Sequence, residues 1–414
     1  MSFDLDAVRA QFPALAIKDG GQRRIYLDNP AGTQVPASVA AAMSDCLLTS
    51  NANLGGGFSS SDAAEVIVES ARDAMANFLN APSSSEIVFG QNMTTITLHL
   101  SRSLGRLFRA GDELILSRMD HDANVWPWVL LARDLELEIK WLPFSAETFE
   151  FDLKELDTLL SDRTRLVCVG GASNLTGTLN DVAAICAKAR SAGALTYIDG
   201  VQSVPHVATD VQALGCDFLV CSPYKFFCPH QGVLWGRREV LEQLEPYKVR
   251  PAPTEIPGCF ETGTQSHEGF AGIKAAIDYF DWIGTSMTGA DSGPQAMRAA
   301  MELLFDYEKL LASHLIDGLM AIDGVTVQGI TAAEAMNRRV PTVAFTHDRV
   351  TAGDIAASLA QENIFVWSGH NYAVEVAKTL GIYESGGAVR VGPVHYNSVH
   401  ELDEFLSALD RILP

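Results

Sequence analysis

Residues 194–225 read ALTYIDGVQSVPHVATDVQALGCDFLVCSPYK, and this stretch decides the fold. Two short apolar runs within it, ALTYIDG (194–200) and FLVCSPY (218–224), are typical of buried strands with a longer segment between them. Similar runs occur earlier, at IVFG (87–90), ELILS (113–117), LEIKWLP (137–143) and RLVCVGG (165–171). Helical spacing fills several gaps, for example residues 179–193. The alternation predicts an α/β fold with a mostly parallel sheet flanked by helices.

The second part of the chain has a different pattern. Long helical patterns occupy residues 270–283 and 293–322, and shorter helical and strand-like pieces follow, such as VPTVAFTH (340–347). We therefore expect three regions: an N-terminal segment 1–25, a large ligand-binding domain 26–270 and a smaller α+β domain 271–414. The N-terminal segment is expected to pack with the smaller domain.

Composition limits the class of protein. The 414 residues include 30 Lys+Arg and 51 Asp+Glu, a formal net charge of −21, and 47% are hydrophobic. This apolar content is enough for a sizeable core and excludes disordered and collagen-like classes. Because a nucleic-acid backbone would be repelled by so acidic a chain, we expect no nucleic-acid partner.

Cysteine usage and hydropathy suggest a cytoplasmic protein. The seven cysteines include no Cys-x-x-Cys pair, so neither a zinc site nor a disulfide framework is supported. The start, MSFDLDAVRAQFPAL, lacks the basic patch and apolar run of a signal peptide, and no apolar stretch is long enough to span a bilayer. We expect no membrane partner and no metal.

Two charged residues lie at the ends of the two strands predicted within residues 194–225. Asp199 and Lys225 are 26 residues apart, about one strand–helix–strand step, so they fall at neighbouring strand ends, where α/β folds bind ligands. Pyridoxal phosphate (PLP) chemistry uses such a pair: the amine joins the cofactor and the acid keeps the ring nitrogen protonated. An exposed lysine and a helix-capping aspartate are the alternative interpretation of each residue taken singly.

Seven segments, in order, carry a resemblance to a known family. They are YLDNPAGTQVP (26–36), MDHDANVWPW (119–128), ASNLTGT (172–178), YIDGVQS (197–203), SPYK (222–225), FETGT (260–264) and AVRVGPVHYN (388–397). Together they resemble the class V, fold-type I PLP enzymes of the cysteine desulfurase and selenocysteine lyase group. The resemblance extends from about residue 26 to residue 397.

The resemblance implies roles for the residues that would hold the cofactor. Lys225 is implied to form the Schiff base and to shuttle the Cα proton, which requires a lowered pKa. Asp199 is implied to pair with the pyridinium nitrogen, and His121 to stack on the cofactor face. The remaining implied contacts are Asn174 and Gln202 to the ring oxygen, and Thr94, Thr95 through its backbone, and Ser222 to the phosphate.

Further roles concern the substrate and a second subunit. Arg390 matches an arginine that clamps the substrate α-carboxylate, for which its planar fork is suited, with Asn174 nearby. Thr264 matches a threonine that reaches the phosphate of the neighbouring subunit. The resemblance thus implies a homodimer with shared active sites and a small amino-acid substrate.

The chain departs from this family where sulfur transfer would occur. Tyr372, expected beside the substrate, stands where the family has its cysteine, and a phenol cannot hold a persulfide. Gly55 and Gly56 replace a His-Arg pair, and Tyr224 replaces a histidine. Cys228, close to Lys225, is interpreted either as a sulfur or redox residue or as a small buried packing residue.

Three functions therefore remain open from the sequence. The first is a cysteine desulfurase-like enzyme acting at Cα or Cβ of an amino acid by transamination or β-elimination. The second is an epimerase or racemase, in which Lys225 works with Tyr372 or His121 on the opposite face. The third is a non-catalytic scaffold or sulfur-relay partner that has kept the fold.

Overall fold

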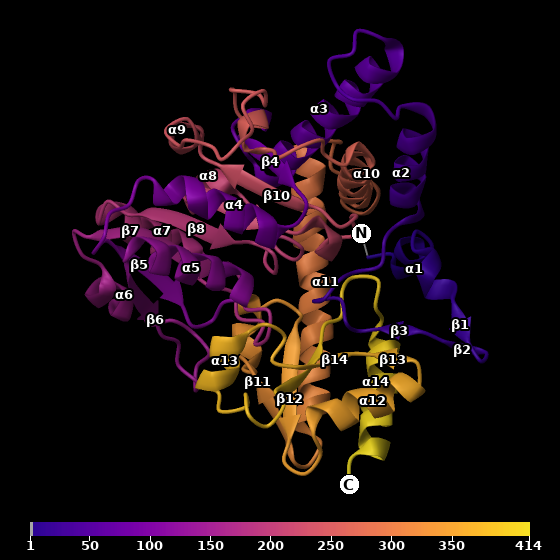
Figure 1. Ribbon diagram of the computed structural model, residues 1–414. Coiled ribbons are helices and arrows are strands. Elements are labelled where there is room, and N and C mark those ends of the chain that lie inside the picture. Colours follow the sequence, from indigo (N-terminus) through magenta and orange to yellow (C-terminus); the bar gives the residue numbers. More distant parts are fainter. Residues whose placement is uncertain (1–2) are drawn as a thin grey trace.

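A seven-stranded sheet lies at the centre of the computed structural model, which describes residues 3–414 (Figure 1). Six strands run parallel to one another and β10 runs antiparallel to both its neighbours. In spatial order the strands are β4 (Ile87–Gly90), β10 (Gly232–Gly236), β9 (Phe218–Cys221), β8 (Leu195–Asp199), β7 (Thr164–Gly170), β5 (Glu113–Ser117) and β6 (Glu138–Leu142). The predicted mostly parallel sheet is confirmed.

Alternate strand residues enter two separate cores. In β8, Tyr197 packs into the core covered by α4 (Met93–Gly105) and α5 (Trp126–Leu135), whereas Ile198 packs into the opposite one. That opposite core includes α3 (Ser59–Leu79), α7 (Val182–Ser191) and α10 (His267–Ile283). Because both faces are covered, the strands are continuous apolar runs rather than alternating ones.

The register of the central strands brings their carboxyl ends together. Gly170 of β7 pairs with Asp199 of β8, and Asp199 pairs with Val220 of β9. Lys225 follows in a short 3-10 helix, Pro223–Lys225. Both residues of the predicted pair therefore lie at the same edge of the sheet.

A second, four-stranded antiparallel sheet forms the smaller domain at the bottom of Figure 1. Helix α11 (Pro294–Met320) runs from the large sheet to this one and contributes to both cores, with Met301 in the first and Leu315 in the second. The strands are β11 (Val325–Gln328), β12 (Val343–His347), β15 (Ala388–Val391) and β14 (Trp367–Gly369), and the other packed helices are α12 (Ala352–Gln361) and α14 (Val399–Ile412).

The N-terminal residues contact both parts of the molecule. β3 (Ile25–Tyr26) pairs with β13 (Ile364–Phe365), and Arg9 forms an ion pair with Glu401 at 2.9 Å. The Phe12 ring meets the Phe227 ring of the large core edge-on, at 5.7 Å between centroids. The division into residues 1–25, 26–270 and 271–414 remains a prediction.

The remaining regular elements are short, apart from one helix. They are α1 (Leu5–Arg9), β1 (Lys18–Asp19), β2 (Gln22–Arg23), α2 (Ala37–Thr49), α6 (Leu153–Leu159), α8 (Val211–Leu214), α9 (Arg238–Leu241) and α13 (Val374–Thr379). Within residues 3–414, every helix is too short or too polar to cross a membrane. The same part of the chain contains no group of three His, Cys, Asp or Glu side chains placed to hold a metal ion.

A buried ion pair anchors the segment that carries Thr264. Arg72 donates to both carboxylate oxygens of Glu261 at 2.7 Å, and the Phe89 amide of β4 donates to the same carboxylate at 2.8 Å. Both charged side chains are only 10% exposed. Removing one partner of such a pair leaves the other charge buried and uncompensated.

Glu261→Gln is therefore expected to lower the free energy of unfolding by about 3 kcal/mol, measured by urea denaturation of the cofactor-free protein. Glu242→Gln, which removes the exposed i,i+4 partner of Arg238, serves as the control and should leave the midpoint unchanged. Equal midpoints for the two variants would contradict the anchoring role of Glu261.

Candidate active site

A pocket with a void of about 460 Å³ opens at the carboxyl edge of the large sheet. Its lining includes seven of the eleven predicted site residues: Thr94, His121, Asn174, Asp199, Gln202, Ser222 and Lys225. Thr95, Thr264, Tyr372 and Arg390 are not among the lining residues. The structure thus brings together most of the predicted cofactor contacts.

Lys225 and Asp199 form the charged centre of this pocket. Lys225 is 7% exposed and Asp199 is 6% exposed. Burial lowers the pKa of Lys225, and the positive charge of Arg390 lowers it further, while Asp199 and Asp28 oppose this. Burial also raises the pKa of Asp199, whose carboxylate accepts the Val201 amide at 2.9 Å. A neutral amine can act as a nucleophile or a base.

His121 lies in the same pocket and is held in one orientation. Its Nδ1 accepts the Ala123 amide at 3.0 Å, so the nitrogen on this side carries no proton. Burial lowers the pKa of His121 to about 3, and the positive charges of Lys225 and Arg390 contribute. His121 is therefore neutral across the physiological range.

Asp120, which the sequence analysis missed, is a second buried acid beside Asp199. Its carboxylate accepts hydrogen bonds from the Ser117 hydroxyl (2.7 Å), the Asn124 amide group (2.7 Å) and the Gly170 backbone (2.8 Å). Burial raises the pKa of Asp120 to about 7, and the negative charge of Asp199 adds to this. Its position directly before His121, just after a strand, was the available signal.

A second cluster crosses from the large to the small domain. Arg390 of β15 donates to the Asn174 carbonyl at 3.2 Å and forms an ion pair with Asp28 at 3.5 Å. Two buried atoms here, Asn174 Oδ1 and Arg390 Nε, have no hydrogen-bond partner, whereas Asp28 Oδ1 faces Arg390 in the ion pair. Since buried polar groups are normally satisfied, this cluster has the unused donors and acceptors that a polar ligand requires.

The predicted phosphate contacts differ in availability. Thr94 and Ser222 line the pocket, and the Ser222 hydroxyl makes no capping hydrogen bond to the 3-10 helix that follows it. The Thr95 amide and hydroxyl both donate to the Asn92 side chain, which caps α4, at 2.8 and 2.9 Å. Thr264 is exposed. Gln202 lines the pocket, but its amide nitrogen already donates to the Pro30 carbonyl at 2.8 Å.

Tyr372 lies beside His121, outside the pocket lining. The two rings stack at 5.3 Å between centroids with an interplanar angle of 18°, and Tyr372 is 67% exposed. Both Asn371 and Tyr372 have positive φ, at 51° and 58°, a conformation that non-glycine residues rarely adopt. The Asn174 amide group and the Asp122 backbone hold this turn by donating to the two carbonyls, at 2.7 and 2.8 Å.

The other family departures also have definite environments. Tyr224 lines the pocket and stacks on His230 at 4.8 Å between centroids. Cys228 is buried in the apolar core, and burial raises the pKa of its thiol well above the usual value, as expected for a packing residue. Gly55 and Gly56 lie in an exposed turn whose amides donate to Glu65 and Ser61.

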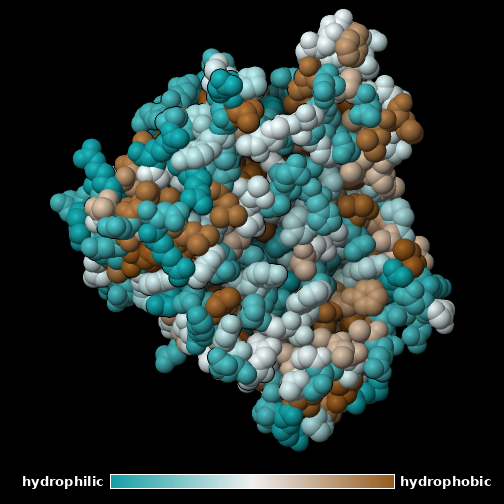
Figure 2. Space-filling view, in the orientation of Figure 1, coloured by the Kyte–Doolittle hydropathy of each residue, from teal (hydrophilic) through white to brown (hydrophobic). Residues whose placement is uncertain are grey.

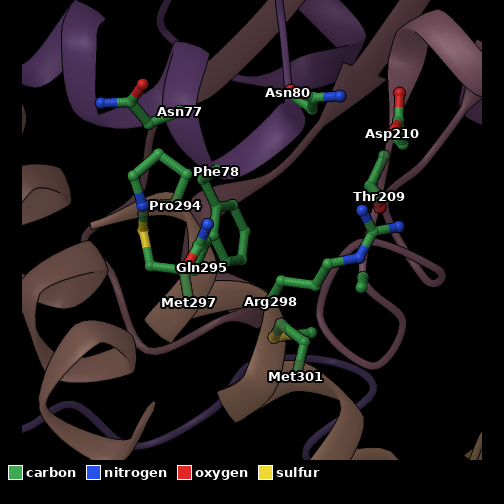
Figure 3. Close-up of a pocket in the computed structure, with 11 residues that line it drawn as sticks. Asn77, Phe78, Asn80, Thr209, Asp210, Pro294, Gln295, Met297, Arg298 and Met301 are labelled. Atoms are coloured by element: carbon green, nitrogen blue, oxygen red, sulfur yellow. The ribbon is translucent and has the colours of Figure 1, made fainter. Parts of the chain in front are cut away.

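A second pocket, with a void of about 560 Å³, lies between the end of α3 and the start of α11 (Figure 3). Figure 3 shows a mixed lining that includes Phe78, Asp210 and Arg298. None of its lining side chains has a buried polar atom without a partner, and none lines the pocket at the sheet edge. The pocket at the sheet edge, although smaller, is therefore the candidate active site, because Lys225, Asp199 and His121 line it.

The fold, with an amine and a carboxyl group paired at the sheet edge, is that of a fold-type I enzyme. Comparison of the sequence with protein families identifies the family. The family model described as aminotransferase class-V matches residues 25–405. The chain belongs to this family of PLP-dependent enzymes, which confirms the predicted enzyme class. Among curated relatives, a cysteine desulfurase of Pectobacterium atrosepticum is 33% identical, with 100% of this chain and 98% of the relative covered. One of Yersinia pestis is 32% identical, with 100% and 99% covered.

Solved structures agree with this assignment. The apo structure of a cysteine desulfurase from Thermococcus onnurineus has a TM-score of 0.88 at 27% identity, with 99% of both chains covered. A cysteine desulfurase from Escherichia coli has a TM-score of 0.85 at 26% identity, with 100% of this chain and 99% of that chain covered. The similarity therefore extends over both domains.

The pocket has the chemical groups that PLP requires. A buried amine whose pKa is lowered by burial is available for the aldehyde, and the buried Asp199 carboxyl group lines the same pocket for the ring nitrogen. Hydroxyl groups of Thr94 and Ser222 line the same void, close to the start of α4, where backbone amides favour a phosphate. The residues present fit this cofactor.

The low pKa of His121 has a measurable consequence. Because a pKa near 3 keeps the imidazole neutral above about pH 4, we expect its ring proton NMR signal to stay unshifted from pH 5 to pH 8. The signal is assigned by its loss in His121→Gln. A titration midpoint inside this range would show that the ring is not desolvated as the structure describes.

Proposed function

We propose that the protein is a PLP enzyme that acts at Cα or Cβ of an amino acid, with Lys225 holding the cofactor covalently. The observation that carries this proposal is the buried Lys225 amine facing the same pocket as the buried Asp199 carboxylate. An exposed lysine and a helix-capping aspartate, the alternative interpretation, do not match this burial. The family assignment supports the same cofactor.

Each charged residue would have a separate task. Bound PLP supplies an electron sink for a carbanion at Cα. Asp199 would keep the ring nitrogen protonated, and Lys225 Nζ would accept the Cα proton and return it. Burial favours the neutral amine needed for that step. His121 would pack against the cofactor as a neutral ring.

The cluster around Arg390 would bind the substrate α-carboxylate. Arg390 Nε is a buried donor without a partner, so a carboxylate oxygen could accept from it. The unpartnered Asn174 side-chain oxygen can only accept, so it would face an N–H or O–H of the ligand, and the Asn174 carbonyl holds the guanidinium at 3.2 Å. A carboxylate at this position would accept from the guanidinium and orient the amino acid against Lys225. The neighbouring Asp28 would keep Arg390 charged despite its burial.

The reaction we favour is transamination or β-elimination, without a persulfide on this chain. All seven cysteines are buried, including Cys228, and the exposed residue beside His121 is Tyr372. The relatives are named cysteine desulfurases. β-Elimination of a sulfur-containing substrate would break its Cβ–S bond and release the sulfur as free sulfide, so no thiol acceptor is needed.

Epimerisation is the second candidate, because Lys225 and neutral His121 line one pocket and could each handle a proton. The distinction is made by incubating the holoenzyme with single amino acids in D₂O. Keto acid or sulfide would indicate the first candidate, and recovery of both stereoisomers with deuterium at Cα would indicate the second.

Lys225→Ala tests the attachment directly. We expect the wild-type protein with PLP to gain a borohydride-trapped mass on the peptide containing Lys225, while Lys225→Ala gains none and loses all turnover. Lys274→Ala, which removes an exposed lysine paired with Asp278, is the matched control and should label like the wild type. Absence of the adduct in wild-type protein supplied with PLP would support the non-catalytic scaffold instead.

We further propose a homodimer in which Thr264 completes the partner's phosphate site. Thr264 is exposed and absent from the lining of its own chain's pocket. Large apolar side chains are also exposed on α2 and around the start of α3, including Leu48, Phe58 and Val66, and Figure 2 shows hydrophobic patches among polar residues over this part of the molecule. Exposed apolar clusters of this kind commonly mark interfaces.

A mixed dimer tests the shared site. Lys225→Ala and Thr264→Ala chains, with different tags, are co-expressed and the heterodimer is purified. One of its two sites then has both Lys225 and Thr264 intact, so about half of the wild-type PLP occupancy is expected at limiting PLP. A heterodimer no better than the Thr264→Ala homodimer would show that each chain builds its site alone.

A further inference from the structure

Arg339 is a buried guanidinium without an acidic partner. It is 2% exposed, and in residues 3–414 no carboxylate lies within ion-pair distance of it. Burial lowers the pKa of Arg339 to about 10. A desolvated charge of this kind is costly unless several strong hydrogen bonds compensate it.

The compensation comes entirely from backbone carbonyls. The two terminal nitrogens donate to Thr342 (2.6 Å), Thr176 (3.4 Å) and Ile330, and Nε donates to Val340 at 3.4 Å. These carbonyls belong to one segment of the large domain and two segments of the small one. A single planar fork therefore joins three stretches of chain.

Backbone contacts around Arg339 reinforce this junction. The Val340 amide donates to the Gly177 carbonyl at 2.8 Å, and the Leu179 amide donates to the Arg338 carbonyl at 2.9 Å. Gly177 has φ +76°, and a Cβ there would lie 2.3 Å from the Thr342 carbonyl oxygen. Only glycine permits so close an approach in this conformation.

The two ends of the junction lead to Arg390, which is proposed to bind the substrate carboxylate, and to Asn174, whose carbonyl holds Arg390. Thr176 is two residues from Asn174 in the same buried loop. Thr342 directly precedes β12, in which Ala344 pairs with Arg390 of β15. Arg390 in turn donates to the Asn174 carbonyl. Arg339 thus bonds both segments that lead to the Arg390–Asn174 contact: the loop with Asn174 and the residues before β12.

We propose that Arg339 is a positioning residue that holds the Asn174 loop against Arg390 and so places the Arg390 guanidinium for the substrate α-carboxylate. The inference rests on the proposed function, because it assumes that an amino acid binds there. An apolar side chain could fill the same volume, but it could not hold carbonyls from three segments. The guanidinium therefore fixes the relative position of the three segments. This position is important because a binding group misplaced by a fraction of an ångström makes a weaker contact.

The test compares two probes that differ only at the carboxyl group, L-alanine and L-alaninamide. Dissociation constants are measured from the change in visible absorbance of the holoenzyme. Arg339→Met is expected to weaken L-alanine binding about 10-fold and to leave L-alaninamide binding unchanged, so the ratio of the L-alaninamide to the L-alanine dissociation constant falls about 10-fold. A general loss of stability would move both probes together.

Matched variants make the result specific. Arg338→Met removes the neighbouring exposed guanidinium, which pairs with Glu150, and should retain the wild-type ratio. Arg390→Gln removes the guanidinium proposed to bind the carboxylate, so this variant should no longer prefer L-alanine over L-alaninamide. If Arg339→Met does not fold, Arg339→Lys replaces it, because a point ammonium reaches fewer carbonyls and should still lower the ratio.

An unchanged ratio in a folded Arg339 variant would overturn the inference. A wild-type protein that binds both probes equally would overturn it too, since no carboxylate site would then need positioning. Failure of the proposed function is seen separately, as the absence of a borohydride-trapped adduct on Lys225 in wild-type protein supplied with PLP.

Discussion

The structure depends on burying an amine and a carboxylate together at the edge of a parallel sheet. Lys225 and Asp199 are both desolvated, so neither charge is stabilised by water, and each influences the ionisation of the other. Parallel strands make this arrangement accessible because their carboxyl ends open on one side. The covering helices then exclude solvent from the strands without blocking that edge.

The site also requires a fixed relation between two domains. Arg390 comes from the small sheet, and the loop with Asn174 comes from the large one, yet their contact is buried. Helix α11 contributes side chains to both cores, which limits relative movement of the two sheets. Arg339 lies closer to the site, because it donates to the carbonyls of Thr176, near Asn174, and Thr342, directly before β12. In the proposed function, binding of the substrate therefore depends on packing outside the pocket itself.

Much of this arrangement was predictable, for a definite reason. Buried parallel strands are continuous apolar runs, and a 26-residue separation is one strand–helix–strand step, so Asp199 and Lys225 could be placed together before any coordinates. The acid at Asp120 was missed because its one signal, the position just after a strand and directly before His121, does not by itself indicate burial. The Thr95 amide was assigned to a phosphate, whereas in the structure it donates to the Asn92 cap, and the two uses cannot be separated from the sequence.

Short-range hydrophobic periodicity and chain connectivity were enough to predict the main elements, their order and the sheet edge at which the charged pair lies. The contacts between distant residues arise only when the chain packs: Arg390 with Asn174, 216 positions apart, Tyr372 against His121, and the Arg339 guanidinium among carbonyls of both domains. Such contacts are set by how whole layers pack and by which polar groups lose water together. Neither quantity is encoded in the spacing of neighbouring residues.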